Sequence, residues 1–431
     1  MNNTLNLVYD NGRSAGLHGA GRDGHVVVLV HEGVYGAVSG SGFSNRAFLT
    51  ALARILPYGN LVVVPVLLPQ GHPGHDPCWA AEVEGMLADA GAHVLPVRGA
   101  SLLGTPVDCE ALCYLAVRRA AAYLDGGGLL VGCDVPFLAI GSYAPEGVDV
   151  LLVPRSTAKL TRPGDQEQIA WEQHGLDAAA ERGGRIAAIS AHMRDHLVNA
   201  YGLPTRAVVD LPNGLLGNEG RTEPAHMLPL PASAEAGFVL AMGRAEASKG
   251  FADLLHALRL LANERFPVPH MVLVAGSRSG ESNAYQKHLR GLLDRYDLDA
   301  SLLTRFDPRV RGWLHHPKLR AVVVPSRTEP FGRIPLEAFA AGAGPVVATT
   351  AGGLAQTVLD GVTGFSAPPA APLALALALR RALEVSPVER AQLAKEGARL
   401  VAERHDYAAT IQGALAECAP WVFQARAGGC G

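Results

Sequence analysis

Two glutamates with a glycine-containing turn between them form the segment of this chain best suited to chemistry. Glu329 and Glu337 are separated by seven residues, and Pro330-Phe331-Gly332 directly follows the first of them. The apolar run 321–324 predicts a buried strand before this segment, and the composition of 334–341 predicts a helix after it. We therefore expect both carboxylates and the backbone amides of the turn to point into a cleft.

This layout suits a nucleotide-sugar. The N–H groups at a helix N-terminus favour a phosphate, and carboxylates beside them can accept hydrogen bonds from sugar hydroxyls. The alternative is an ordinary strand-to-helix connection in which both glutamates are solvated or cap the helix.

The surrounding residues favour the first interpretation. Four short matches, Pro325-Ser326, Glu329-Pro330-Phe331-Gly332, Leu336-Glu337-Ala338 and Gly352-Gly353, make the segment resemble the retaining glycosyltransferases of family 4, which have the GT-B fold. The resemblance implies that Glu329 lies near the donor hexose hydroxyls and that Glu337 holds the ribose diol. It also implies that the backbone of Pro330, Phe331, Gly332 and Arg333 meets the diphosphate.

A second motif begins after the predicted strand 238–242. Gly243-Arg244 is followed by Lys249-Gly250, and an Arg and a Lys on such a loop can converge on one diphosphate. This resembles the Gly-Arg…Lys-Gly motif of the same family, which implies that Arg244 and Lys249 stabilise the leaving nucleoside diphosphate. With Glu329 they form the expected catalytic set. The alternative is a solvated Arg and Lys flanking a helix.

The turn after the next strand contains Gly276 and Arg278. The family often places a glycine turn near the nucleotide base, and Arg278 is positioned to reach the base or a phosphate. A plain strand-to-helix turn is the alternative.

The first half departs from the family at one position. The family sets a histidine just after a strand, and Arg155 stands at the matching place within 152–159. An Arg does not act as a general base at neutral pH, but its five donors suit an anionic or hydroxyl-rich ligand. Three explanations stay open: a shifted alignment, a donor with altered chemistry, or a pseudo-glycosyltransferase that couples a nucleotide-activated cyclitol to an amino sugar.

Other acceptor-side candidates are weaker. Asp134 ends a predicted strand and is expected either to orient an acceptor group or to cap a helix. Gly40, Ser41 and Gly42 lie in a predicted glycine-rich loop, 33–46, that faces the acceptor or a phosphate. The His/Asp/Cys loop 72–78 is expected to be solvated, since a zinc site needs a closed ligand set. We expect neither a metal nor another cofactor, with the nucleotide-sugar as co-substrate.

Strand and helix patterns alternate through both halves of the chain. Continuous apolar runs such as 25–31 and 61–68 are typical of parallel strands covered on both faces. The predicted fold class is α/β of the GT-B type, with two Rossmann-like domains facing each other across a cleft. We expect an acceptor-binding domain over 1–215, a linker over 216–236, a donor-binding domain over 237–405 and a C-terminal helix, 406–431, that braces the first domain.

Composition excludes several partner classes. The net charge of −3 over 431 residues gives no reason to expect nucleic acid, and no basic amphipathic helix or apolar run of membrane-spanning length is present. Six cysteines without a CxxC pair fit reduced thiols, and the N-terminus does not read as a signal peptide, so we expect a cytoplasmic protein.

The sequence therefore predicts a retaining glycosyltransferase that moves a sugar from a nucleotide-diphosphate donor to a small soluble acceptor. Tailoring of a secondary metabolite, such as an aminoglycoside antibiotic or another pseudo-oligosaccharide, is the expected setting. The alternatives are the pseudo-glycosyltransferase, a nucleotide-sugar epimerase or hydrolase, and a non-catalytic nucleotide-sugar-binding protein.

Overall fold

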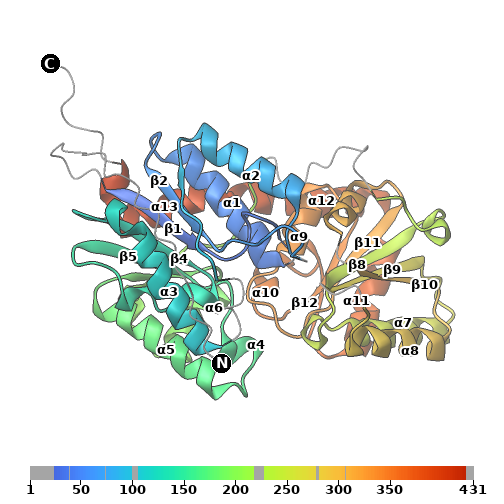
Figure 1. The fold of residues 1–431 in the computed structure, drawn as a ribbon. Helices are drawn as coiled ribbons and strands as arrows, with labels where there is room; N and C mark the ends of the chain where they lie inside the picture. The colour runs from blue at the N-terminus through green and yellow to red at the C-terminus, as the bar shows by residue number, and fades with distance from the viewer. Residues whose placement is uncertain are drawn as a thin grey trace.

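The computed structural model describes residues 24–37, 39–72, 74–99, 105–217, 228–277, 281–305 and 307–423. They form two α/β lobes side by side, each built around one parallel sheet (Figure 1). The predicted pair of Rossmann-like halves is confirmed. We call them the first lobe and the second lobe in chain order.

The sheet of the first lobe has seven parallel strands among the described residues, in the order β3-β2-β1-β4-β5-β6-β7. Strands β1 and β4 are almost wholly buried because helices cover both faces of the sheet. The sequence patterns did not predict β7, which has three residues and is too short to show a periodicity. The bounds are β1 His25–Val30, β2 Leu61–Pro65, β3 His93–Val94, β4 Gly128–Cys133, β5 Val148–Val153, β6 Arg185–Ala188 and β7 Val208–Asp210.

The sheet of the second lobe has six parallel strands in the described part of the chain, in the order β10-β9-β8-β11-β12-β13. The short edge strand β13 was also not predicted from the sequence. The bounds are β8 Phe238–Arg244, β9 His270–Ser277, β10 Ala300–Arg305, β11 Leu319–Val324, β12 Val346–Thr349 and β13 Gly364–Ala367.

Amphipathic helices cover these sheets. In α7, for example, Leu254, Leu258 and Leu261 recur at helical spacing and are buried. The first lobe contains α1 Gly40–Ile55, α2 Pro77–Asp89, α3 Pro106–Ala120, α4 Ala158–Thr161, α5 Gln166–Glu181 and α6 Ala191–Asn199. The second lobe contains α7 Phe251–Asn263, α8 Ala284–Tyr296, α9 Arg333–Ala340, α10 Leu354–Thr357, α11 Pro372–Glu384 and α12 Pro387–Arg404.

The chain returns to the first lobe at its end. Helix α12 packs on α9 of the second lobe, whereas α13, Tyr407–Cys418, packs on α1 (Figure 1). Between them the backbone of Leu215 donates to the His405 carbonyl at 2.9 Å and accepts from the Tyr407 N–H at 3.1 Å. Because a Cβ on Gly214 would lie 2.2 Å from the same carbonyl, a glycine is needed where the two segments cross.

Several expectations fall partly outside the described residues, including the domain predicted over 1–215, of which 1–23 are not described. The predicted linker 216–236 includes 218–227, and the predicted C-terminal helix 406–431 includes 424–431, which lie outside them. Within the described ranges, none of the helices combines the length and the apolarity required to cross a bilayer.

In both sheets the strand order reverses around the first strand of the lobe, between β1 and β4 and between β8 and β11. Ligands of such sheets bind outside the carboxyl ends of the strands at this point. The segments that follow β1, β8 and β11 are therefore where a site is expected, and they contain most of the motif residues.

Candidate active site

A large pocket lies between the two lobes. It encloses about 1370 Å³ of space, a volume that includes open solvent, and residues of both lobes line it. Second-lobe residues that line it include Gly243, Arg244, Lys249, Gly276, Glu329, Pro330, Phe331, Gly332 and Arg333. First-lobe residues that line it include Ser39, Gly40, Ser41, Ser44, Arg155, Ser156 and Thr161.

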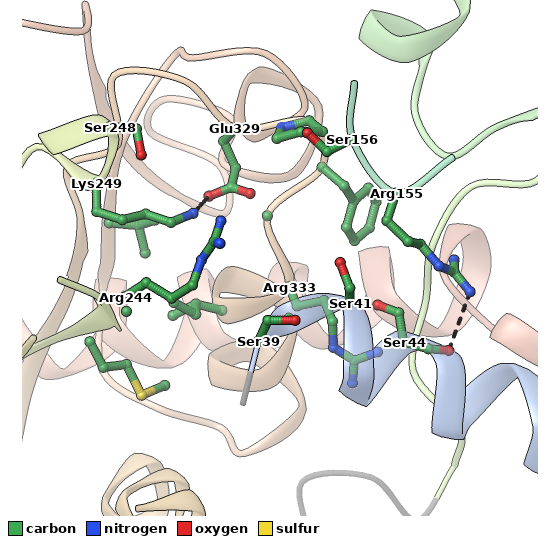
Figure 2. Close-up of a pocket in the computed structure, with 18 of the residues that line it drawn as sticks. Ser39, Ser41, Ser44, Arg155, Ser156, Arg244, Ser248, Lys249, Glu329 and Arg333 are labelled. Carbon is green, nitrogen blue, oxygen red and sulfur yellow. Dashed lines mark hydrogen bonds and ion pairs between the residues drawn. The ribbon is translucent and has the colours of Figure 1, made fainter. Parts of the chain in front are cut away.

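Three charged side chains meet on the second-lobe wall. Arg244 ends β8, Lys249 precedes α7, and Glu329 follows β11; all three point into the same space (Figure 2). The Lys249 ammonium lies 2.6 Å from a Glu329 carboxylate oxygen. Arg244 is 3.1 Å from the partly exposed Glu246. The structure thus brings the predicted catalytic residues together, with two cations and one anion at one wall.

Close backbone packing sets the position of Lys249. The next residue, Gly250, has φ +65°, and a Cβ there would lie 1.9 Å from the Pro325 carbonyl oxygen. The Arg327 guanidinium donates two hydrogen bonds of 2.7 Å to the Asp253 carboxylate. The backbone N–H of Arg327 donates to the Ser248 carbonyl at 2.7 Å. These contacts join the loop before α7 to the loop after β11, so Lys249 and Glu329 face each other.

The Pro330–Gly332 turn leads directly into α9. Gly332 is the N-cap residue with φ +91°, a backbone conformation that suits glycine, and α9 begins at Arg333. The hydroxyl of Ser190, at the start of α6 in the first lobe, donates to the Pro330 carbonyl at 2.7 Å. The first turn of α9 therefore borders the pocket beside Arg244 and Lys249, where its amide dipoles favour an anion.

Glu337 occupies a different environment from Glu329. Its side chain is 4% exposed, 2.9 Å from the Arg311 guanidinium and 3.2 Å from that of Arg333. Burial by itself would raise the pKa of Glu337, but the two arginines hold this pKa below its usual value. The expectation that both carboxylates point into the cleft holds for Glu329 and not for Glu337, which pairs with Arg311 and Arg333 while these two arginines line the pocket.

On the first-lobe wall, Gly40, Ser41 and Gly42 form the first turn of α1, so the expectation that they lie in a loop is wrong. Ser39 caps this helix, and the buried Glu32 accepts hydrogen bonds from the Ser39 N–H at 3.0 Å and its hydroxyl at 2.7 Å. Gly40 and Ser41 line the pocket. Gly42 instead packs on Glu32, with no space for a Cβ.

Arg155 lines the pocket, but its guanidinium is turned into the first lobe (Figure 2). It donates to the side-chain oxygens of Asn45 at 3.1 Å and Asn213 at 2.6 Å, and to the Tyr407 hydroxyl at 2.8 Å. The expected acceptor-binding role does not fit a side chain used in this way. Arg155 connects α1, the segment after β7 and α13.

Asp134 is not among the residues that line the pocket. It has φ +73° and accepts a hydrogen bond from the Val135 N–H at 2.9 Å, capping the short helix η2, Val135–Phe137. The capping alternative is therefore the one that the structure shows. Arg278 lies outside the described residues.

Two further residues were not predicted. Ser156 lines the pocket, and its buried hydroxyl lacks a hydrogen-bond partner among the described residues. Arg311 belongs to η8, Pro308–His315, and lies between Glu337 and Phe43 of α1. No motif marks either residue, because their roles depend on elements that are distant in the sequence.

Comparison with known proteins agrees with this geometry. Residues 229–400 match the family described as glycosyl transferases group 1. An alignment of 269 positions, covering 58% of this chain and 60% of that protein, shows 31% identity to the D-inositol 3-phosphate glycosyltransferase of Kineococcus radiotolerans. An alignment of 205 positions, covering 45% of this chain and 44% of that protein, shows 33% identity to glycogen synthase of Mycobacterium tuberculosis. The chain thus spans less than two thirds of the length of these relatives.

Solved structures resemble the chain over most of its length. HepE from Anabaena, in complex with UDP-glucose, aligns with a TM-score of 0.66 at 19% identity, covering 90% of this chain and 97% of that one. Sucrose-phosphate synthase from Thermosynechococcus elongatus aligns with a TM-score of 0.68 at 19% identity and the same coverage. At such identities the likeness concerns the fold. The chain therefore has the GT-B fold, and its residues 229–400 match the family model described as glycosyl transferases group 1.

Proposed function

We propose that this protein transfers a sugar from a nucleotide-diphosphate donor to a hydroxyl of a small acceptor, with retention of the anomeric configuration. The observation that carries the proposal is the convergence of Arg244, Lys249, Glu329 and the first turn of α9 on one pocket wall. Two cations and a helix N-terminus match a diphosphate, and a carboxylate at their edge matches sugar hydroxyls.

The proposed reaction needs no enzymic nucleophile. The bond between the anomeric carbon and the diphosphate oxygen breaks, and the acceptor oxygen forms its bond to the same face of that carbon. The acceptor proton passes to the oxygen of the leaving diphosphate. Arg244 and Lys249 stabilise the negative charge that develops there, and the pocket aligns the two substrates. No metal is assigned in this scheme, because these side chains supply the positive charge.

The first-lobe wall supports a small hydroxylated acceptor. Four serines and one threonine line it, and the Ser156 hydroxyl has no hydrogen-bond partner among the described residues. Hydroxyl groups both donate and accept, as recognition of a polyol requires. The proposal includes acceptors of the amino-cyclitol type, which belong to secondary metabolism.

The test is an incubation with UDP-, ADP-, GDP- and dTDP-glucose, each offered with glucose, myo-inositol or 2-deoxystreptamine. We expect one donor and acceptor pair to give an α-linked product by NMR, and the Arg244→Ala/Lys249→Ala variant to lose this turnover while keeping its melting temperature. A β-linked product would contradict retention. Wild-type turnover in the double variant would contradict the assigned site.

Incubation of each donor without acceptor separates the alternatives. Rapid epimerisation would identify an epimerase, and donor loss at a rate that acceptors do not change would identify a hydrolase. Tight donor binding by calorimetry without turnover across the panel would favour a binding protein. Slow hydrolysis that acceptors accelerate is the result expected for a transferase.

A further inference from the structure

Glu337 lies at the centre of two contacts that join the lobes. On one side its carboxylate is 2.9 Å from the Arg311 guanidinium, whose central carbon lies 3.6 Å from the centre of the Phe43 ring in α1. On the other side it is 3.2 Å from the Arg333 guanidinium, which donates to the Gly214 carbonyl at 3.3 Å. The buried carboxylate of the second lobe is thus linked twice to the first lobe.

The contact between Arg311 and Phe43 is a close one. Cation–π attraction acts within about 6 Å of a ring centre, and Arg311 stands well inside this range. The Phe43 ring also packs against the Trp79 ring in an edge-to-face arrangement, with ring centres 5.0 Å apart. Phe43 therefore offers a fixed surface to the guanidinium.

This contact differs from the other contacts between a cation and an aromatic ring. In the described part of the chain, Arg46 on Trp79, Lys159 on Tyr201, Arg155 on Phe48 and Tyr407, Arg380 on Phe266 and Arg381 on Phe365 all join groups that pack within one lobe. Arg311 alone among them stacks on a ring of the opposite lobe. Its stack forms only when the lobes face each other at this spacing.

Arg311 also lines the pocket, and α1 presents its first turn to the same pocket. We propose that Arg311 is a positioning residue that couples the donor wall to α1: stacked on Phe43 and paired with Glu337, it holds the lobes in the arrangement in which a bound nucleotide-sugar meets the acceptor. The proposal rests on the transferase function proposed above. It assigns Arg311 no contact with the reacting atoms.

The first test uses Phe43→Leu, which removes the ring but keeps apolar bulk on the first lobe. The probe is whichever of UDP, ADP, GDP and dTDP binds the wild type most tightly, and turnover is measured with the matching glucose donor and best acceptor. We expect the dissociation constant of the nucleoside diphosphate to stay within about twofold, because Phe43 lies outside the donor wall, while kcat falls about tenfold. Phe43→Tyr keeps a ring and should restore most of kcat.

A matched control exists in the second lobe. Phe266→Leu removes a ring under Arg380 within one lobe, and Arg381→Lys alters a stacked arginine on Phe365. Both controls should leave kcat unchanged.

Arg311→Lys keeps the positive charge but loses the planar group that stacks on Phe43, so it should lower kcat about as much as Phe43→Leu does. Adding Phe43→Leu to Arg311→Lys should lower kcat little further.

Small-angle X-ray scattering measures the radius of gyration, which depends on how the two lobes are arranged. Local destabilisation within one folded lobe does not change it. With the nucleoside diphosphate bound, Phe43→Leu and Arg311→Lys should both show a larger radius of gyration than the wild type. The coupling role is overturned if Phe43→Leu keeps wild-type kcat or if Phe43→Tyr lowers kcat as much as Phe43→Leu does. It is also overturned if the losses of kcat from Phe43→Leu and Arg311→Lys multiply in the double variant. If instead no nucleoside diphosphate binds the wild type, the transferase function itself fails.

Discussion

The Lys249 ammonium and the Glu329 carboxylate lie 2.6 Å apart on the pocket wall, and each side chain is less than one fifth exposed. The ion pair holds Lys249 in place before any substrate arrives, so little side-chain entropy is lost when a diphosphate binds. A carboxylate this close also opposes a second anion at the same cation. In the function proposed above, Glu329 therefore holds the sugar hydroxyls but weakens the binding of the diphosphate.

The variant Glu329→Gln separates these effects. It removes the negative charge beside Lys249, so the affinity for a nucleoside diphosphate without a sugar should stay equal or rise severalfold. Sugar transfer should fall about 100-fold, because the amide holds the hexose hydroxyls less strongly in the transition state. Calorimetry with the nucleoside diphosphate and initial rates with the nucleotide-sugar measure the two outcomes. Glu246→Gln, next to Arg244 on the exposed side, is the control and should change both by less than about threefold.

Gly250 tests how the Lys249 loop is positioned. Gly250→Ala combines an unfavourable positive φ with a Cβ 1.9 Å from the Pro325 carbonyl oxygen, so the loop must move. We expect a loss of about 3 kcal/mol in the free energy of unfolding, together with weaker nucleoside diphosphate binding. Gly59→Ala is the control, because Gly59 has φ +81° and open space around it; about 1 kcal/mol is expected there. Equal losses from both variants would show that the close contact at Gly250 is unimportant.

Arg155 is expected to stabilise the fold rather than to bind the acceptor. Arg155→Met leaves the side-chain oxygens of Asn45 and Asn213 and the Tyr407 hydroxyl without a buried donor, at a cost of about 2–4 kcal/mol in unfolding free energy. Arg182→Met is the matched control, since Arg182 also donates to several oxygens but from an exposed position. Denaturant unfolding compares the two variants. If Arg155→Met kept wild-type stability but raised the KM for the acceptor, Arg155 would instead be assigned to acceptor binding.

The lowered pKa of His196 predicts that the folded protein loses stability as the pH falls below neutrality. Burial, with smaller contributions from His192 and Lys159, lowers the pKa of His196 from 6.5 to about 4, and its Nε2 lies 2.8 Å from the Thr157 hydroxyl. The unfolded chain therefore takes up this proton first as pH falls, so the stability present above pH 6.5 is lost progressively towards pH 4. Because the imidazole is partly exposed, solvent screening limits the loss to about 1 kcal/mol, or 2–4 °C in melting temperature.

Calorimetry at several pH values checks this prediction. His196→Gln should lose less stability than the wild type between pH 6.5 and 4. Exposed His174, on α5 of the same lobe, is the control position, and His174→Gln should follow the wild-type profile. Parallel profiles for the wild type and His196→Gln would show that His196 does not carry the effect.

Sugar transfer should persist in EDTA. Arg244, Lys249 and the first turn of α9 border the space assigned to the diphosphate, so the scheme assigns charge stabilisation to the protein itself. Initial rates with and without EDTA should agree within about twofold. A large loss that added Mg²⁺ or Mn²⁺ reverses would assign part of this stabilisation to a metal.

Local patterns predicted the α/β architecture and the donor-wall motifs. The runs that became β1, β2, β8 and β11 are continuous and apolar because helices cover both faces of a parallel sheet. Arg244, Lys249 and Glu329 were predicted from motifs that resemble family 4, and each lies at or shortly after a strand end, where the strand ends of a switch point converge. Short edge strands such as β7 contain too few residues to show a hydrophobic pattern in the sequence.

Partners distant in the sequence could not be predicted in this way. Arg155 reaches Asn213 and Tyr407, 58 and 252 positions away, and only the return of α13 to the first lobe brings Tyr407 to it. The same holds for Glu337, whose partner Arg311 lies on η8 and stacks on a ring of α1. By itself the sequence determined the two-lobed fold through its alternating strand and helix patterns, and its resemblance to family 4 indicated the charged residues that we propose face a diphosphate. Only the tertiary structure decided which motif residues face the pocket and which hold the lobes together, because side-chain direction depends on the elements packed opposite.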